Sequence, residues 1–349
     1  MRWPSFRSAA VDHRLTPNGR TQLARPFACL ALACLGLGTA PSAAVAQDCD
    51  RACLETLLDG YVGAVVAHDP QRLPLAAGVK FTENGQRLAL GDGLWHTATG
   101  SGGYALQLAD VERAQAVLMG TIREADIPTV LVARLGVVGG RVAEIETLVI
   151  RDREVAERLD EIGAPRSAWS TPVPAGERHS RAALVQVANQ YFSGIERNDG
   201  RGDYPLARDC ARLENGLVLA GDLTLVSPRA KGRPGGSQVG CLEQFRSGVF
   251  FYVTRIRDRR FVLVDPERGI VFAFAFFDNA GGDSRFGTLA DGRRVESGPK
   301  IPWTWGIAEA FKIERGLIGP VESVLHQVPY GMGSGWSTWE EALSSEPRG

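Results

Sequence analysis

Two stretches of the chain carry apolar residues at helical spacing, and each is followed by strand-like segments. Residues 53–68 and 182–195 place apolar side chains every three to four positions, which predicts two helices. Apolar segments bounded by turn residues predict strands after each helix. They span residues 116–122, 129–138 and 141–150 in the first half and 249–256, 261–265, 270–278, 303–313 and 320–328 in the second. This order predicts α+β units in which a curved antiparallel sheet wraps over a helix.

The order of these segments is repeated along the chain. Glu-Asn-Gly stands at 83–85 after the first helix and again at 214–216 after the second. Each Asn-Gly pair is a hairpin signal. Residues 141–150 and 317–326 follow near the ends of the two halves, each after a turn. Matched landmarks in the same order indicate a tandem duplication.

The remaining segments set the expected domain boundaries. The Pro-rich residues 163–176 predict a linker between a first unit, residues 47–162, and a second unit, residues 177–349. Gly, Pro and basic residues at about 221–240 predict a long surface loop inserted into the second unit.

Residues 1–46 have the order of a secretory signal peptide. Arg20 and Arg25 precede the apolar run 27–38, and an A-x-A sequence ends at Ala46. The apolar run is too short to span a bilayer. We therefore expect an exported protein, periplasmic or secreted, without a membrane span; the exact translation start stays open.

Export gives the cysteines a structural meaning. Beyond residue 46 an even set remains, Cys49, Cys53, Cys210 and Cys241. In an oxidising compartment this set predicts two disulfides, 49–53 and 210–241, one in each half. Cys49 must then precede the helix that Cys53 opens, because cysteines four apart inside one helix cannot bond. The alternative, a metal site, would need nearby histidines and a spacing typical of zinc.

Composition and motifs exclude several classes of function. The 349 residues carry 39 Lys and Arg against 40 Asp and Glu, a net charge of −1, which gives no electrostatic footprint for nucleic acid. No phosphate-binding or dinucleotide-binding fingerprint occurs, and no histidine pair has the spacing of metal ligands. We expect no cofactor and no metal.

Four stretches carry a resemblance to known proteins. They are Lys80-Phe-Thr-Glu-Asn-Gly-Gln86, Leu90-Gly-Asp-Gly-Leu-Trp95, Ile256-Arg-Asp-Arg-Arg260 and Val324-Leu-His-Gln-Val-Pro-Tyr-Gly331. These stretches resemble a family of exported bacterial and fungal proteins without assigned function. The order of elements resembles two tandem SnoaL-like units of the nuclear transport factor 2-like superfamily.

The resemblance implies cone-shaped units, each with a pocket between the concave face of its sheet and its N-terminal helices. The superfamily includes cofactor-independent isomerases, cyclases, dehydratases and lyases that act on aromatic substrates, and also units that only bind or dimerise. Two linked units can replace the dimer that is common in the superfamily, so a homo-oligomer stays open.

The second unit is richer in candidate acids and bases. His326 lies in a predicted strand, on the same face as Glu322 by the period of two, and the matching position of the first half is Ile150. Asp278 ends a very apolar strand, and Glu214 belongs to the second Glu-Asn-Gly. We expect His326 to act as base or acid, with Asp278 or Glu214 as orienter or second acid. Each also has a structural explanation: a hydrogen-bonded histidine, a turn-forming aspartate and a solvated glutamate.

Aromatic and basic side chains complete the expected pocket. Tyr252, Trp303, Trp305 and Tyr330 could form its walls, and Arg255 could bind an anionic group. The alternative for the tryptophans is a place in the core. The sequence thus predicts a lyase, dehydratase or isomerase acting on a small hydrophobic or aromatic molecule. The alternative is a periplasmic binding or scaffold protein without turnover.

Overall fold

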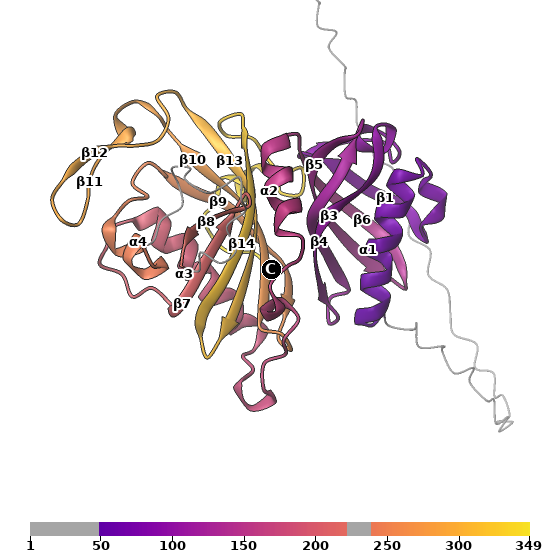
Figure 1. Ribbon diagram of the computed structural model, residues 1–349, viewed down its shortest axis with the longest axis horizontal. Helices are drawn as coiled ribbons and strands as arrows, with labels where there is room; N and C mark the ends of the chain where they lie inside the picture. The colour runs from indigo at the N-terminus through magenta and orange to yellow at the C-terminus, as the bar shows by residue number, and fades with distance from the viewer. Residues whose placement is uncertain (1–48, 222–238) are drawn as a thin grey trace, which may run out of the picture. The chain divides into compact units, whose positions relative to one another are not determined.

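The computed structural model describes residues 49–221 and 239–349, which form two six-stranded sheets with few helices (Figure 1). The first half contains α1 (Arg51–Val66), β1 (Leu75–Glu83), β2 (Gln86–Arg87), β3 (Ala98–Asp110), β4 (Gln115–Glu124), β5 (Ile127–Val138), β6 (Arg141–Ile150) and α2 (Arg153–Ile162). The second half contains α3 (Arg181–Arg197), β7 (Leu206–Glu214), β8 (Leu217–Ala220), α4 (Cys241–Ser247), β9 (Arg255–Asp265), β10 (Ile270–Asn279), β11 (Phe286–Thr288), β12 (Arg294–Glu296), β13 (Trp303–Glu314), β14 (Leu317–Val328) and α5 (Trp339–Leu343).

The two sheets have the same strand order. It is β2-β1-β6-β5-β4-β3 in the first sheet and β8-β7-β14-β13-β10-β9 in the second. Each sheet contains one parallel pair, β1 with β6 and β7 with β14, and its other pairs are antiparallel. Thr82 is opposite Glu146, and Leu213 is opposite Glu322. These equivalent registers confirm the match of Glu146 with Glu322, and the fold is consistent with two tandem units.

The two Asn-Gly sequences form equivalent hairpin turns, as predicted. Asn84 and Asn215 have φ angles of 49° and 51°, in the left-handed region that asparagine tolerates. The Asn215 side chain also accepts from the Leu325 amide and donates to the Leu325 carbonyl, each at 3.0 Å. Asn84 makes the same two bonds with Val149. Each asparagine therefore both turns the chain and ties the hairpin to the neighbouring strand.

One prediction about secondary structure is wrong, and several elements of the structure have no counterpart among the predictions, among them α2 and β3. Residues 249–256 were expected as a strand, but β9 begins only at Arg255, and Phe250 and Val253 enter the core from a turn. The helix α2 was not expected. Nor was β3, whose strand pattern is broken by glycines: a Cβ at Gly102 would lie 2.0 Å from the Thr121 hydroxyl oxygen on the next strand. Because the neighbouring strand comes so close, glycines stand where apolar side chains would otherwise alternate, and the hydrophobicity pattern does not indicate a strand here.

Each sheet is buried on both faces. One face of the first sheet packs on α1, and one face of the second packs on α3 and α4. The other faces share a third apolar cluster, which includes Met119 and Val132 of the first sheet and Phe272 and Ala308 of the second. The strands β3 and β4 contact β9 there. The faces of the two sheets that the helices α1, α3 and α4 do not cover therefore pack against each other and join the two halves.

Both predicted disulfides are present. Cys49 precedes the helix cap Asp50 and bonds Cys53 in the first turn of α1, and Cys210 of β7 bonds Cys241 of α4. Disulfides of this kind are typical of extracellular or periplasmic proteins. The part of the chain that is described contains no helix long and apolar enough to cross a membrane. The predicted signal peptide and most of the predicted insertion lie outside the described residues, and the domain boundaries stay predictions.

We expect the Cys210–Cys241 disulfide to contribute more to stability than Cys49–Cys53. The bonded cysteines are 31 positions apart in the first case and 4 in the second. In the chain-entropy model their loss costs about 4 and about 2 kcal/mol of unfolding free energy, respectively. Urea unfolding of C210S/C241S, with C49S/C53S as control, measures the difference. Equal losses in the two variants would contradict this account.

Candidate functional site

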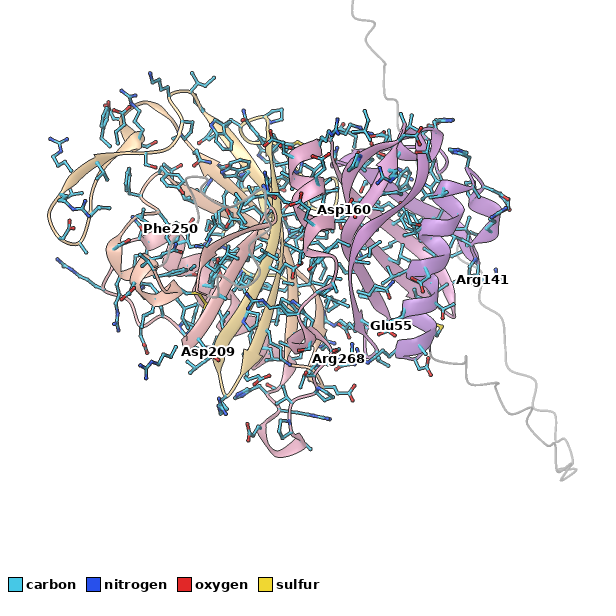
Figure 2. The ribbon with its side chains drawn as sticks, in the orientation of Figure 1. Glu55, Arg141, Asp160, Asp209, Phe250 and Arg268 are labelled. Atoms are coloured by element: carbon cyan, nitrogen blue, oxygen red, sulfur yellow. A yellow bond between two sulfur atoms is a disulfide. The ribbon has the colours of Figure 1, made fainter. Side chains whose placement is uncertain are left out.

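A cavity lies between α3 and the second sheet, on the face that the helices cover. We call it the helix-side cavity. Its space, open mouth included, is about 500 Å³. It is lined by Tyr191, Ile195, Arg212, Glu214, Leu219, Phe250, Tyr252, Val253, Phe277, Trp305, Ile307, Glu309, Ser323 and Leu325. Phe250, labelled in Figure 2, packs edge-on against Phe245 of α4. Most of the wall is apolar.

Three polar residues form a row across the floor of the cavity. Glu309 of β13 is opposite Ser323 of β14, and Ser323 is opposite Glu214 of β7. Adjacent strands are about 4.8 Å apart, which places the two glutamate backbones roughly 10 Å from each other. Paired residues point to the same face of a sheet. The two carboxyl groups therefore enter the cavity from either side of Ser323.

Arg212 holds the first of these carboxyl groups. Its Nη2 donates to Glu214 Oε2 at 2.9 Å, and its Nη1 donates to Gln244 Oε1 at 2.8 Å. The guanidinium also lies 5.3 Å from the centre of the Phe250 ring. Arg212 is buried, whereas the Glu214 side chain keeps 20% of its surface exposed. A buried arginine thus holds the Glu214 carboxylate in the cavity.

The surroundings raise the pKa values of the two carboxyl groups to different extents. Burial raises the pKa of Glu309 to about 8; Arg212 opposes this shift, and the charge of Glu214 adds to it. Burial also raises the pKa of Glu214, but the ion pair with Arg212 counteracts the rise. Glu309 therefore carries a proton at neutral pH. When two carboxyl groups have clearly different pKa values, the one with the higher value can act as an acid and the other as a base.

Two buried polar groups of the cavity interact with each other. Glu309 Oε2 and the Tyr191 hydroxyl lie within electrostatic reach of one another, but neither makes a hydrogen bond of ordinary geometry with a described residue. Burial raises the pKa of Tyr191, which keeps this hydroxyl protonated as a donor. Buried polar groups without partners are rare in proteins, and a ligand is one explanation for them.

The first sheet lacks this arrangement. Ala133 stands at the position of Glu309, opposite Thr147, which is in turn opposite Glu83. Phe81 stands at the position of Arg212. Glu83 accepts from the Leu94 amide at 2.8 Å and from Arg151 at 3.1 Å, so its carboxylate is used within the structure. Of the two equivalent rows, the one in the second sheet carries two carboxyl groups.

Three of the predicted site residues line this cavity: Glu214, Tyr252 and Trp305. Trp303 does not line it but packs edge-on against Trp305, with ring centres 4.3 Å apart. Tyr330 follows β14 and is about half exposed, at 48%.

Asp278 and Arg255 belong to an ion cluster at the end of β10. Asp278 is fully buried and accepts from Arg255, from Arg257 at 2.9 Å and from the Thr304 hydroxyl at 2.6 Å. Burial acts to raise the pKa of Asp278, but these donors outweigh it and hold the pKa below its usual value. An ionised carboxylate with this many donors ties β9, β10 and β13 together. It does not line the helix-side cavity.

His326 lies on the opposite face of the second sheet. It shares that face with Glu322, as the period of two predicted, while Ser323 and Leu325 between them point toward α3. Glu322 accepts from the Tyr104 hydroxyl of the first sheet and from Trp169 Nε1. The structure thus separates His326 from Glu214 by the thickness of the sheet.

Sequence reasoning missed Glu309, Arg212 and Tyr191. A signal for Glu309 exists in residues 303–313, where Trp305, Ile307 and Phe311 alternate with smaller residues and Glu309 occupies one place in the same series. A charged residue that takes one of the apolar positions of such a strand is expected to be buried, and burial requires either a charged or hydrogen-bonding partner or a shifted pKa.

The comparisons with known proteins concern the second half of the chain. Residues 177–325 match the family model described as a domain of unknown function (DUF8021). The matched span begins before α3 and ends in β14, so it contains every residue that lines the helix-side cavity. No curated protein matches the chain.

Proposed function

We propose that the second half is a cone-shaped SnoaL-like unit of an exported enzyme, and that its helix-side cavity takes a small hydrophobic or aromatic molecule. The reaction is acid/base chemistry without a cofactor, of the lyase, dehydratase or isomerase type. One observation carries the proposal: two carboxyl groups, Glu309 and Glu214, enter the same apolar cavity from either side of Ser323 in one row, and burial raises the pKa of the first to about 8.

The two carboxyl groups suit proton transfer at carbon next to a carbonyl. Ionised Glu214, oriented by Arg212, removes the proton from that carbon. Protonated Glu309 donates its proton to the carbonyl oxygen, so that a neutral enol forms and the negative charge passes from Glu214 to Glu309 instead of building up on the substrate. Return of a proton to another carbon gives an isomer, and loss of hydroxide together with a proton as water gives a dehydrated product.

The aromatic walls complete this assignment. Tyr252 and Trp305 offer flat apolar surfaces to the body of the substrate, and the Tyr191 hydroxyl offers a second donor for its oxygen. Because these polar groups converge on one apolar space, an enzyme is favoured over the alternative, a binding or scaffold protein. His326 and Asp278, candidates from the sequence, take no part in this mechanism.

Deuterium exchange tests the proposal without knowledge of the natural substrate. A panel of small aryl ketones is incubated with the protein in D₂O, and loss of the protons next to the carbonyl is followed by NMR. We expect exchange above the buffer rate for ketones that bind. In E309Q we expect it to fall by about 10²–10⁴-fold, the usual contribution of a general acid.

The exposed Glu314, near the end of the same strand, provides the matched control E314Q, which should exchange like the wild type. Binding without any exchange would support the alternative of a binding protein. Neither binding nor exchange across the panel would contradict the proposal.

A further inference from the structure

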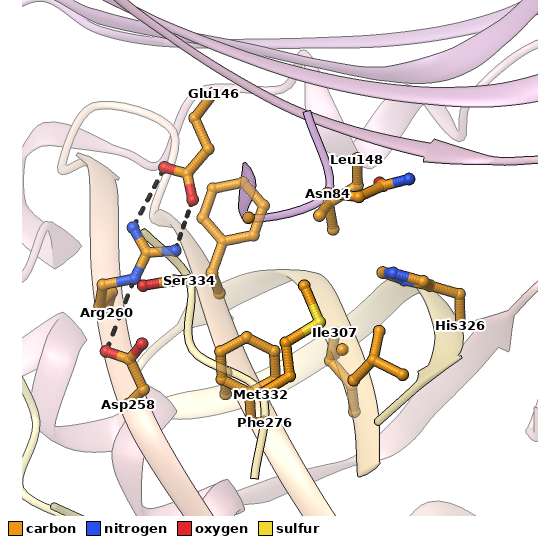
Figure 3. A pocket seen from close by; sticks show the side chains of 15 residues that line it. Asn84, Glu146, Leu148, Asp258, Arg260, Phe276, Ile307, His326, Met332 and Ser334 are labelled. Atoms are coloured by element: carbon orange, nitrogen blue, oxygen red, sulfur yellow. Dashed lines mark hydrogen bonds and ion pairs between the residues drawn. The ribbon is translucent and has the colours of Figure 1, made fainter. Parts of the chain in front are cut away.

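A second cavity lies on the other face of β13 and β14, between the two sheets (Figure 3). We call it the inter-sheet cavity. Its space, open mouth included, is about 380 Å³. Its apolar wall contains Leu148 of the first sheet, Phe274 and Phe276 of the second, and Met332 of the C-terminal segment. It is separate from the helix-side cavity, because the second sheet lies between them.

Comparison of the two halves explains why this space is open. In the first sheet, Val130 is opposite Ile150, and both are buried in the cluster between the sheets. The equivalent pair in the second sheet is Gly306 and His326. A Cβ at Gly306 would lie 3.0 Å from His326 Cε1, so the glycine makes room for the imidazole. The apolar pair Val130 and Ile150 of the first sheet is thus replaced in the second sheet by Gly306 and His326, which fill less space and add a polar ring.

Polar atoms without partners face this space from two sides. The His326 ring interacts with the backbone of Gly306, but neither of its nitrogens makes a hydrogen bond of ordinary geometry with a described residue. Asp258, on the other side of the cavity in Figure 3, is 1% exposed, and its Oδ2 has no hydrogen-bond partner among the described residues. Its Oδ1, by contrast, accepts from Ser337 at 2.6 Å and from Arg348.

These atoms set the chemistry of an occupant. Asp258 Oδ2 can only accept, so it needs a donor. Burial lowers the pKa of His326, and its neutral ring offers one donor and one acceptor. The wall between them is mostly aromatic and aliphatic, and the charged groups Arg260 and Glu146, which also line it, are paired with each other. A hydroxyl on an aromatic ring suits the wall and supplies a partner for one of these polar residues, whereas a purely apolar molecule leaves both without one.

We propose that the inter-sheet cavity is a second binding site, and that it takes a compact uncharged aromatic molecule with a hydroxyl group. The ring lies against Phe274, Phe276 and Met332, and the hydroxyl bonds His326 or Asp258. This site does not depend on the chemistry proposed for the helix-side cavity.

The test uses phenol and toluene, which have the same size and differ in the hydroxyl. The ring signals of His326, assigned by comparison with H326L, are followed by NMR during titration of each molecule. We expect phenol to cause a saturable shift. We expect toluene to bind about tenfold more weakly, the effect of one hydrogen bond.

Variants distinguish this site from the helix-side cavity. G306V/H326I installs the pair of the first sheet, and we expect it to remain folded, since the same pair packs there, and to lose the response to phenol, followed through the methyl signal of Met332. H326L, which keeps Gly306, should bind phenol about as weakly as toluene. E309Q should bind phenol in the inter-sheet cavity like the wild type. No shift of His326 with phenol, or a Met332 response that persists in G306V/H326I, would overturn the proposal.

Discussion

Replacing Glu309 with glutamine (E309Q) is expected to stabilise the protein at high pH. The pKa of this carboxyl is about 8 in the folded protein against a usual 4.5, so between these values the folded state binds more protons than the unfolded state. The free energy of unfolding of the wild type therefore falls as the pH rises from about 4.5 to 8. Glutamine does not titrate. At pH 9 we expect E309Q to be more stable by a few kcal/mol, roughly 1.4 kcal/mol for each pH unit of the shift at most.

Urea unfolding at pH 5, 7 and 9 measures this difference. Glu322, whose pKa burial raises to about 7, contributes a smaller fall that remains in E309Q. The control E314Q alters an exposed carboxyl and should leave the pH dependence as in the wild type. Parallel stability curves for E309Q and wild type would mean that Glu309 is ionised at neutral pH, and its role as an acid would be lost.

Replacing Arg260 with methionine (R260M) is expected to destabilise the contact between the two sheets. Arg260 of the second sheet donates to Glu146 of the first through Nη2 at 2.5 Å and Nη1 at 3.1 Å (Figure 3). Burial acts to raise the pKa of Glu146, but Arg260 and Arg134 outweigh it and hold the pKa low. Without Arg260, the buried Glu146 carboxylate has only Arg134 to balance its charge. Removing one partner of a buried ion pair typically lowers the free energy of unfolding by about 3–5 kcal/mol.

Two further variants make this test specific. E146L/R260M removes both charges and should recover part of the loss, because no uncompensated carboxylate is left and Arg134 keeps Glu144 and Gln115 as partners. R285M breaks the pair of Arg285 with the half-exposed Glu296, where we expect at most about 1 kcal/mol. If R260M loses no more than R285M in urea unfolding, the ion pair does not hold the sheets together.

The features that follow from local chemistry were predictable from the sequence. An even set of four cysteines gave both disulfides, and the two Asn-Gly pairs gave both hairpins. The strand β14 marks the limit of this reasoning. A period of two groups Glu322 with His326, but β14 is buried on one side by α3 and on the other by the first sheet. With both faces buried, hydrophobicity does not tell which face meets the helix.

The candidate site was partly predictable for a related reason. Glu214 stood out beside a recognisable turn, whereas Glu309 was hidden in a strand that is apolar on both faces. Its partner Arg212 and the helix residue Tyr191 approach it from other elements, and only the fold brings these together. Asp278 looked like an acid at the end of a strand, but three elements converge there to supply donors that the sequence does not connect.

The protonation of Glu309 tests the central claim most directly. Carbon-13 NMR of the glutamate side-chain carboxyl groups, with signals assigned by E309Q and E214Q, follows each group through a titration. We predict that Glu309 titrates near pH 8 and Glu214 at a lower pH, so that one acid and one base coexist at neutral pH. Titration of Glu309 near pH 4.5 would contradict the account.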